Sequence, residues 1–290
     1  MTAKALVLGS TGMLGSAVFA ELEKAGLHPI SASRTSGVKF DATTLLVDEL
    51  FSNAVISAGD YVVNCVGLTK SRIDESSAQD RALAVRLNVD FPDALAIAAQ
   101  RAGVRVIQVA TDCVYSGLKG SYSESDKHDP LDVYGKTKSL GEIPSDSVMH
   151  LRCSLIGPEI GRSSLFFEWV RQQPEGSKVT GFTNHLWNGL SSDAFGRIVS
   201  GILKSGSFRA GVQHLVPADV QTKDQLVRTV LSELSRLDVE VESGLADHPI
   251  DRTLGTDNAE FNAQLFRMAG YEQLPTIRQM VHETCAQLAN

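Results

Sequence analysis

The N-terminal residues place a short apolar run, a glycine-rich segment and an amphipathic run in direct succession. Residues 5–8 are all apolar, residues 9–12 read Gly-Ser-Thr-Gly, and apolar side chains recur at four-residue spacing over residues 13–25. The short apolar run predicts a buried strand, and the four-residue spacing predicts a helix. Because Gly26 supplies a helix stop and residues 28–33 again have strand character, the chain is predicted to open with a βαβ unit.

Further along, apolar strands alternate with helices. Residues 61–63, 104–110 and 148–153 are predicted strands, and a long amphipathic helix is expected over about residues 80–102. Strands that are apolar at every position, rather than at alternate positions, indicate a parallel sheet covered on both faces. The predicted fold class is therefore α/β with a doubly wound parallel sheet, whose ligands bind at the carboxyl ends of the strands.

The regular alternation loosens after residue 155. Residues 1–155, together with about 190–215 returning to them, are expected to form the larger domain. Residues of about 156–189 and 216–290 mix short strands, turns and helices, and are expected to form a smaller α+β domain packed over the first. A chain of 290 residues can build such a core without disulfide or metal support.

The amino-acid composition argues against several classes of binding partner, metal site and cellular location. Lys and Arg number 27 against 34 Asp and Glu, a net charge of −7, so neither a nucleic acid nor an anionic membrane is an expected partner. The four cysteines form no CxxC pair, which argues against a zinc site or a disulfide framework. The residues after Met1 do not resemble a signal peptide, and no apolar run reaches the roughly 18 residues of a membrane helix, so a cytoplasmic location is expected.

Three glycines follow the first predicted strand at GxxGxxG spacing, where the first helix begins. A helix N-terminus offers unpaired N–H groups and the positive end of its dipole, and glycine lets a dinucleotide pyrophosphate approach the backbone. This segment is predicted to bind the cofactor, although a tight turn without a ligand would show the same pattern. The cofactor contacts expected in the loop are Gly9, Thr11, Gly12, Met13, Leu14 and Gly15.

The end of the second predicted strand bears on which dinucleotide is bound. Ser33 and Arg34 stand where an acidic residue would hold the adenosine ribose 2′-OH, and an arginine there can pair with a 2′-phosphate. NADPH is therefore favoured over NADH, with a solvated loop arginine as the alternative. Asp41 can reach the adenine amino group, or it can cap the helix that follows.

A tyrosine and a lysine suggest carbonyl chemistry. Tyr134 and Lys138 are four residues apart, so on a helix they share one face. The Lys138 ammonium can lower the pKa of the Tyr134 phenol and make it a proton donor to a carbonyl near neutral pH. Thr111, at the end of a predicted strand, can hydrogen-bond the same carbonyl. The alternative is a surface helix that carries an aromatic residue and two solvated lysines.

These segments together resemble a known family, the extended short-chain dehydrogenase/reductases, and within it the dTDP-4-dehydrorhamnose reductase group of nucleotide-sugar reductases. The motifs that carry the resemblance occur in the expected order over about the first 155 residues. They are Gly9-Ser10-Thr11-Gly12-Met13-Leu14-Gly15, Asn64-Cys65-Val66-Gly67, Asn88-Val89, Ala110-Thr111-Asp112-Cys113-Val114-Tyr115-Ser116-Gly117, Tyr134-Gly135-Lys136-Thr137-Lys138 and Leu151-Arg152-Cys153-Ser154.

The resemblance implies a Rossmann domain that binds NADPH, or else NADH, and a smaller C-terminal domain that closes over a sugar nucleotide. It implies hydride transfer to the C4 keto carbon of a 4-keto-6-deoxy sugar, in deoxysugar or polysaccharide biosynthesis. Tyr134 would protonate the nascent alkoxide, Lys138 would tune Tyr134 and hold the nicotinamide ribose, and Thr111 with Asp112 would position the substrate. The further cofactor contacts implied are Val66, Gly67, Leu68, Tyr134 and Lys138.

No metal is expected, because the glutamates that bring magnesium to some dimers of the family cannot be matched here. A homodimer is compatible with the resemblance, although the sequence does not fix the oligomeric state.

The chain departs from the family pattern near the expected substrate. Cys113 replaces the usual aromatic residue after the Thr-Asp pair, and Leu155 replaces a tryptophan. Trp187 can supply the lost stacking surface, with a buried core tryptophan as the alternative. Arg252 can meet the diphosphate bidentately, or it can fix a loop by a surface ion pair. The candidate substrate contacts are Thr111, Asp112, Cys113, Trp187 and Arg252.

Two alternative functions remain open at this point. The related GDP-fucose synthases epimerise before they reduce and carry a cysteine at the place of Cys113, with His185 as the candidate second acid here; a small buried cysteine is the simpler interpretation. A non-catalytic NADP-binding subunit is the other, since a relative with this fold is the regulatory subunit of a methionine adenosyltransferase. A dehydratase is disfavoured, because Cys113 stands where that enzyme would carry a glutamate.

Overall fold

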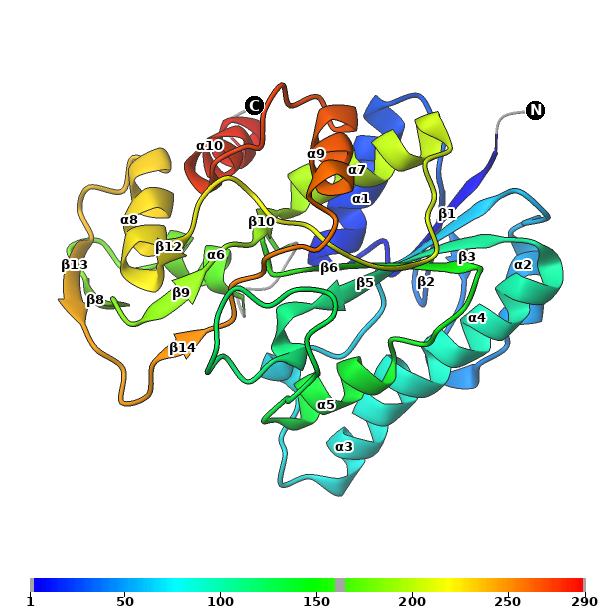
Figure 1. Ribbon diagram of the computed structural model, residues 1–290, viewed down its shortest axis with the longest axis horizontal. Helices are drawn as coiled ribbons and strands as arrows, with labels where there is room; N and C mark the ends of the chain where they lie inside the picture. The colour runs from blue at the N-terminus through cyan, green and yellow to red at the C-terminus, as the bar shows by residue number, and fades with distance from the viewer. Residues whose placement is uncertain (1–2, 160–164, 289–290) are drawn as a thin grey trace.

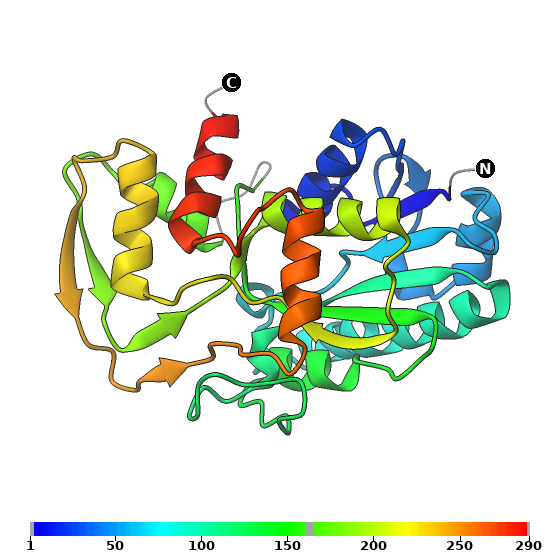
Figure 2. The same cartoon turned by 45° about the horizontal axis from the view of Figure 1, so that its top comes forward.

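The computed structural model describes residues 3–159 and 165–288. Its larger part is an all-parallel, seven-stranded sheet of order β11-β6-β5-β4-β1-β2-β3, and its smaller part lies at one end of the molecule (Figures 1 and 2). The strands of the large sheet are β1 (Ala5–Leu8), β2 (Ile30–Ser33), β3 (Val38–Lys39), β4 (Tyr61–Asn64), β5 (Arg105–Thr111), β6 (Val148–Cys153) and β11 (Gly211–His214). The predicted α/β fold with a doubly wound parallel sheet is confirmed.

Helices cover both faces of this sheet, which is why β1 in its centre is apolar at every position. Ala5 and Val7 of β1 belong to an apolar core on one face, whereas Leu6 and Leu8 belong to a second core on the other face. The first face carries α1 (Met13–Lys24), α7 (Ser192–Ser205) and α9 (Ala259–Met268) (Figure 1). The second carries α2 (Val47–Asn53), α3 (Ala78–Val85), α4 (Phe91–Ala102) and α5 (Val133–Leu140).

A π-helical turn interrupts the long helix on the second face. The helix expected over residues 80–102 is present as α3, a π turn at Arg86–Asp90, and α4. In the turn, the Asn88 amide accepts the Leu68 N–H (2.8 Å) and donates to the Leu68 carbonyl (3.0 Å) and to Thr137 Oγ1 (3.1 Å). Turns of this kind occur mostly at functional sites. Here the turn ties the segment after β4 to α5.

The smaller part consists of short sheets and helices. The strand β8 (Lys178–Phe182) pairs with β13 (Glu240–Gly244), and β9 (His185–Trp187) lies between β12 (Gln221–Thr222) and β14 (Ile250–Asp251). The remaining strands and helices are β7 (Leu155–Ile156), β10 (Leu190–Ser191), α6 (Phe166–Arg171), α8 (Lys223–Glu233) and α10 (Ile277–Leu288). In the larger part, 3-10 turns follow β3, β4 and β5, at Ala42–Thr44, Lys70–Arg72 and Asp112–Val114. One apolar core joins both parts, since it includes Val18 of α1 as well as Leu226 of α8.

The chain crosses between the two parts more than once. After β9 and β10 the chain returns to the larger part as α7, which packs along α1. The two helices are close at Gly196, where an added Cβ would lie 3.0 Å from Glu21 Cβ. The sequence assigned residues 216–290 to the smaller domain, whereas α9 packs on α7 (Figure 2). Two of the sequence-based expectations involve residues that the structure does not describe. Residues 160–164 belong to the segment 156–189 expected in the smaller domain, and residues 1–2 belong to the N-terminus that does not resemble a signal peptide.

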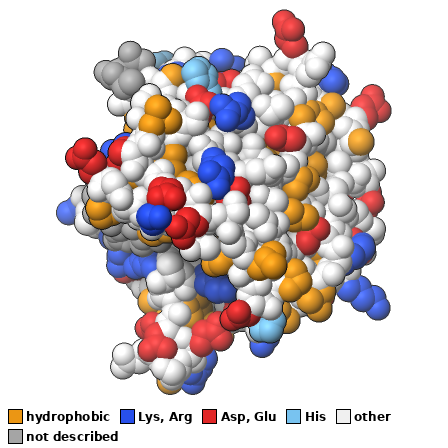
Figure 3. All heavy atoms as spheres, turned by 90° about the vertical axis from the view of Figure 1, so that its left-hand side faces the viewer, with side chains coloured by type: hydrophobic (Ala, Val, Ile, Leu, Met, Phe, Trp, Pro, Cys, Tyr) orange, Lys and Arg blue, Asp and Glu red, His pale blue; other side chains and the backbone are white. Residues whose placement is uncertain are grey.

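The surface of the smaller part carries acidic and basic side chains interspersed with one another (Figure 3). Within residues 3–159 and 165–288, no helix combines the length and the hydropathy that crossing a bilayer requires.

Candidate active site

A cavity of about 760 Å³ lies along the carboxyl ends of the sheet strands and extends to α6. This volume is in the range of ligand sites of enzymes. The structure brings most of the expected site residues to its walls: Gly9, Thr11, Gly12, Met13, Leu14, Ser33, Arg34, Asp41, Val66, Gly67, Leu68, Thr111, Asp112, Cys113, Tyr134 and Lys138. Gly15, Trp187 and Arg252 are not among the lining residues.

The glycine loop forms a turn that opens α1 toward this cavity. Gly9 has a φ of +73°, and its carbonyl accepts the Gly12 N–H at 2.9 Å. No side chain caps the start of α1, so its first N–H groups remain available to an anion. Gly15 serves the turn rather than the cavity wall, because a Cβ there would come within 2.1 Å of the Gly9 oxygen. This backbone fits a dinucleotide pyrophosphate.

The residues after β2 form the other end of the expected cofactor site. The Ser33 hydroxyl accepts the Ser36 N–H at 2.9 Å and so closes the turn, while Arg34 is exposed at the cavity wall. Asp41 lines the cavity and also caps the following 3-10 turn, since it accepts the Thr43 N–H at 2.9 Å. The bonds from Thr43 lower the pKa of Asp41. An arginine in place of an acidic residue directly after β2 suits a 2′-phosphate.

The helix α5 presents Tyr134 and Lys138 together at the cavity wall. The helix begins after Asp132, whose carboxylate accepts the Gly135 N–H at 2.7 Å and pairs with Lys70 at 2.8 Å. Lys138 is buried and donates to the Val109 carbonyl at 2.8 Å, which fastens α5 to β5.

The pKa of Tyr134 differs from the sequence-based expectation. Burial raises the pKa of the Tyr134 phenol above its ordinary value, and the hydrogen bond with Thr111 acts in the opposite direction. The Lys138 ammonium donates to the Val109 carbonyl, and burial lowers the pKa of Lys138 itself. The phenol is therefore protonated at neutral pH, as a proton donor must be.

The turn after β5 places three further groups at the cavity wall. Thr111 donates to the Asp112 carboxylate at 3.2 Å and accepts the Cys113 N–H at 3.3 Å. Burial raises the pKa of Asp112, whereas the charges of Arg252 and Lys223 lower it. Burial, followed by the charge of Asp112, raises the pKa of Cys113 to about 12, so this cysteine is a neutral thiol.

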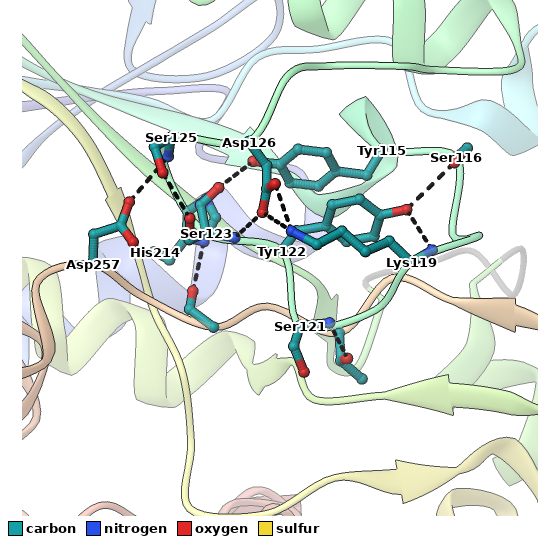
Figure 4. Close-up of polar contacts among 12 residues, drawn as sticks. Tyr115, Ser116, Lys119, Ser121, Tyr122, Ser123, Ser125, Asp126, His214 and Asp257 are labelled. Atoms are coloured by element: carbon teal, nitrogen blue, oxygen red, sulfur yellow. Dashed lines mark hydrogen bonds and ion pairs between the residues drawn. The ribbon is translucent and has the colours of Figure 1, made fainter.

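A long loop supports this turn from outside the cavity (Figure 4). The rings of Tyr115 and Tyr122 stack with their centroids 4.2 Å apart, and the Tyr122 hydroxyl accepts the N–H of Lys119 at 3.0 Å. Lys119 also pairs with Asp126 at 2.5 Å, which closes the loop on itself. The loop holds the polypeptide that follows Cys113 in a single conformation, and sequence motifs alone did not indicate this support.

Three residues singled out in the sequence lie away from the cavity wall. Trp187 is 5% exposed within the common core, and its indole N–H donates to Ser154 Oγ at 2.8 Å, which corresponds to the core alternative. Arg252 donates through Nε to the Tyr115 carbonyl at 2.9 Å. The His185 ring packs at a tilt against Phe182 and contacts the His248 carbonyl, and none of the lining residues is a histidine within the described part of the chain.

Sequence reasoning missed Lys223, the first residue of α8, whose charge acts on both Asp112 and Cys113. Its neighbours come from distant segments, so no local motif could have identified it. For metals, residues 3–159 and 165–288 contain no cluster of three or more His, Cys, Asp or Glu side chains arranged as a metal site.

Comparison with known proteins identifies the family. Residues 3–152, more than half of the chain, match the family model described as RmlD substrate binding domain. The chain belongs to this family. The RmlD match covers the glycine loop and the segment from Thr111 to Lys138, and it confirms the resemblance noted in the sequence at the level of the family.

Curated relatives with two different names match the same half of the chain. Methionine adenosyltransferase 2 subunit beta of Rattus norvegicus is 32% identical over 141 residues, which are 48% of this chain and 41% of that protein. The dTDP-4-dehydrorhamnose reductase of Mycobacterium tuberculosis is 30% identical over 142 residues, which are 47% of this chain and 43% of that protein. The matched region thus spans about two fifths of the length of these relatives.

Solved structures of this RmlD-like fold match the chain over nearly its whole length. A dTDP-4-dehydrorhamnose reductase from Bacillus anthracis in complex with NADP has a TM-score of 0.81 at 17% identity, covering 99% of this chain and 100% of that one. MoeE5 in complex with UDP-glucose and NAD has a TM-score of 0.75 at 22% identity, covering 99% of both chains. At such identities these likenesses show the fold.

Proposed function

We propose that the protein is an NADPH-dependent reductase that acts on the 4-keto group of a nucleotide-activated 4-keto-6-deoxy sugar. The observation that carries this proposal is the meeting of Thr111, Tyr134 and Lys138 on the wall of the cavity that the glycine loop also lines. These residues suit reduction of a carbonyl, and the membership of the RmlD family supports a nucleotide sugar as the substrate.

In this proposal NADPH supplies the hydride, and side chains of the protein donate the proton. Thr111 and Tyr134 hold the substrate carbonyl oxygen between two hydroxyl groups. As charge develops on that oxygen, the neutral Tyr134 phenol donates its proton to it. The buried Lys138 ammonium then stabilises the phenolate until a solvent proton restores it, because an opposite charge nearby favours the ionised form.

NADPH oxidation tests the proposal, with dTDP-, UDP- and GDP-linked 4-keto-6-deoxy sugars as substrates. The variant Tyr134→Phe should lose at least about a hundredfold in kcat, the usual minimum contribution of a general acid, while still binding NADPH. Tyr61→Phe is the matched control, since Tyr61 begins β4 and its hydroxyl accepts from Arg105 instead of lining the cavity. Equal turnover by Tyr134→Phe and the wild type would refute the assignment.

A second candidate is an NADP-binding subunit without its own turnover. It is favoured by the 32% identity to a protein named as a subunit of methionine adenosyltransferase. NADPH that binds tightly in calorimetry, together with no oxidation by any of the keto sugars, would select this candidate over the reductase.

A further inference from the structure

Lys223 lies next to Phe166 of the cavity wall, although it is not itself among the lining residues. Its ammonium lies 4.5 Å from the centroid of the Phe166 ring and 5.3 Å from that of Trp187. Phe166 lines the cavity, and Trp187 is fixed through its hydrogen bond to Ser154, which also lines it. The charge is therefore held over the faces of two ordered aromatic rings, an arrangement that attracts cations.

The start of α8 fixes this position. The Thr222 hydroxyl accepts the Gln225 N–H at 3.1 Å, and the Gln225 side chain accepts the Thr222 N–H at 2.8 Å, so a capping box surrounds Lys223. The adjacent Asp224 does not neutralise the lysine, because its carboxylate accepts from Arg228 (3.0 Å) and from Ser243 (2.9 Å).

The charge of Lys223 is only partly balanced by its surroundings, through the nearby carboxyl of Asp112. Among residues 3–159 and 165–288, no carboxylate lies within ion-pair distance of Lys223 or of Arg252, whose Nε donates to a backbone carbonyl. Both charges act on the single buried carboxyl of Asp112, while the nearby Asp132 is already paired with Lys70. Burial lowers the pKa of Lys223 to about 8, although Asp112 and Cys113 raise it. Lys223 and Arg252 thus both act on Asp112, and the charge of Arg252 also acts on Asp132.

We propose that Lys223 binds an anionic oxygen group of the nucleotide sugar, either its diphosphate or a carboxylate on the sugar, and so helps to determine which substrates the cavity accepts. This inference rests on the proposed function, because it takes the substrate to be a nucleotide sugar. Lys223 acts here as a specificity-determining residue, and the charge of Arg252, which lies behind the cavity wall, adds to the positive potential at Asp112.

Calorimetric binding of UDP-glucose, dTDP-glucose and UDP-glucuronate, each in the presence of NADP⁺, tests the inference. Lys223→Met keeps an apolar stem against Phe166 and Trp187 but removes the charge, and it should weaken binding by about tenfold to a hundredfold, the worth of a charged hydrogen bond. Lys223→Arg should retain binding. The control Lys204→Met removes an exposed positive charge at the end of α7 and should change nothing.

The pattern of losses identifies the source of the anion. Weaker binding of all three ligands by Lys223→Met assigns the lysine to the diphosphate, and weaker binding of UDP-glucuronate alone assigns it to a sugar carboxylate. Unchanged binding of all three overturns this inference but leaves the proposed function standing. If the wild type binds none of them, this inference fails, whereas the proposed function is decided separately by the NADPH oxidation assay. Lys223→Met should bind NADP⁺ as tightly as the wild type does, which shows that the variant is folded. Lys223→Gln, measured in the same way, is a second variant without the charge.

Discussion

Tyr134 and Lys138 lie together on α5, but the groups that surround them come from other parts of the sequence. Their spacing places both on one face of α5, but burial raises the pKa of the tyrosine, and Lys138 bonds to the Val109 carbonyl. The spacing therefore predicted which residues meet, whereas the direction of the pKa shift depends on how deeply the folded chain covers them. Lys223 illustrates the same limit, since its neighbours Asp112 and Phe166 are distant in the sequence.

Arg34 is expected to determine the preference for NADPH. Arg34→Asp should reverse the ratio of kcat/KM for NADPH to that for NADH, because the carboxylate repels a 2′-phosphate and can accept from a 2′-OH. The ratio is measured with the 4-keto sugar substrate and each reduced cofactor in turn. Lys39→Asp makes the same charge change at an exposed position outside the cavity wall and should leave the ratio unaltered. An unaltered ratio for Arg34→Asp would contradict the assignment.

Lys223 should give the reaction a pH dependence. With a pKa of about 8 in the free protein, Lys223 is charged below that pH and neutral above it. If the ammonium binds the substrate anion, kcat/KM falls as the pH rises through about 8, because kcat/KM reports groups of the free enzyme. Lys223→Arg should keep its activity to higher pH, since arginine stays protonated. Identical profiles for the two proteins would argue against this role.

Among the elements, the strands and helices with strong local patterns were predicted well. The apolar run at residues 5–8 is β1, and the four-residue spacing after the glycines gives α1, because both patterns are local. The strand β11 and the short strands β12 and β14 were not predicted, since they are stabilised by pairing with β6 and β9. The π turn was missed for a similar reason, as only the fold brings Asn88 to Leu68.

The π turn provides a prediction at the scale of elements. Asn88→Ala removes the partner of both backbone groups of Leu68, so the free energy of unfolding should fall by about 2–3 kcal/mol, as expected when buried polar groups lose their bonds. NADPH binding should also weaken, because Leu68 lines the cavity. Urea unfolding and calorimetry measure the two effects. Asn53→Ala, at the exposed end of α2, should stay within about 0.5 kcal/mol of the wild type.

Across the whole molecule, a buried arginine connects the sheet to the loops around it. Arg152 of β6 is 1% exposed and pairs with Glu142. It also contacts Nε2 of His128, at 2.8 Å, and Nε2 of His214 in β11. Each histidine must be neutral to accept a hydrogen bond from the guanidinium, so Arg152 is the centre of a network that spans several segments.

This network predicts loss of stability in mild acid. Burial lowers the pKa values of His128 and His214 below 6.5, so beneath that pH the unfolded chain binds more protons than the folded one. The free energy of unfolding should therefore decrease as the pH falls from 7 toward 5, by up to about 1.4 kcal/mol per pH unit for each histidine. Urea unfolding at several pH values measures the slope. His248→Gln, at an exposed position, should leave the slope as it is, and equal stability at pH 7 and 5 would contradict the prediction.

The repeated crossing of the chain has a consequence for how the protein can be divided. The segment that matches the family model ends at residue 152, before α7 and β11. Without them, β6 would become an unprotected edge strand and the outer surface of α1 would lose its apolar cover. We therefore expect residues 3–152 not to fold as an autonomous unit, and insertions or deletions within α7 or β11 to disturb the half that carries the glycine loop as well.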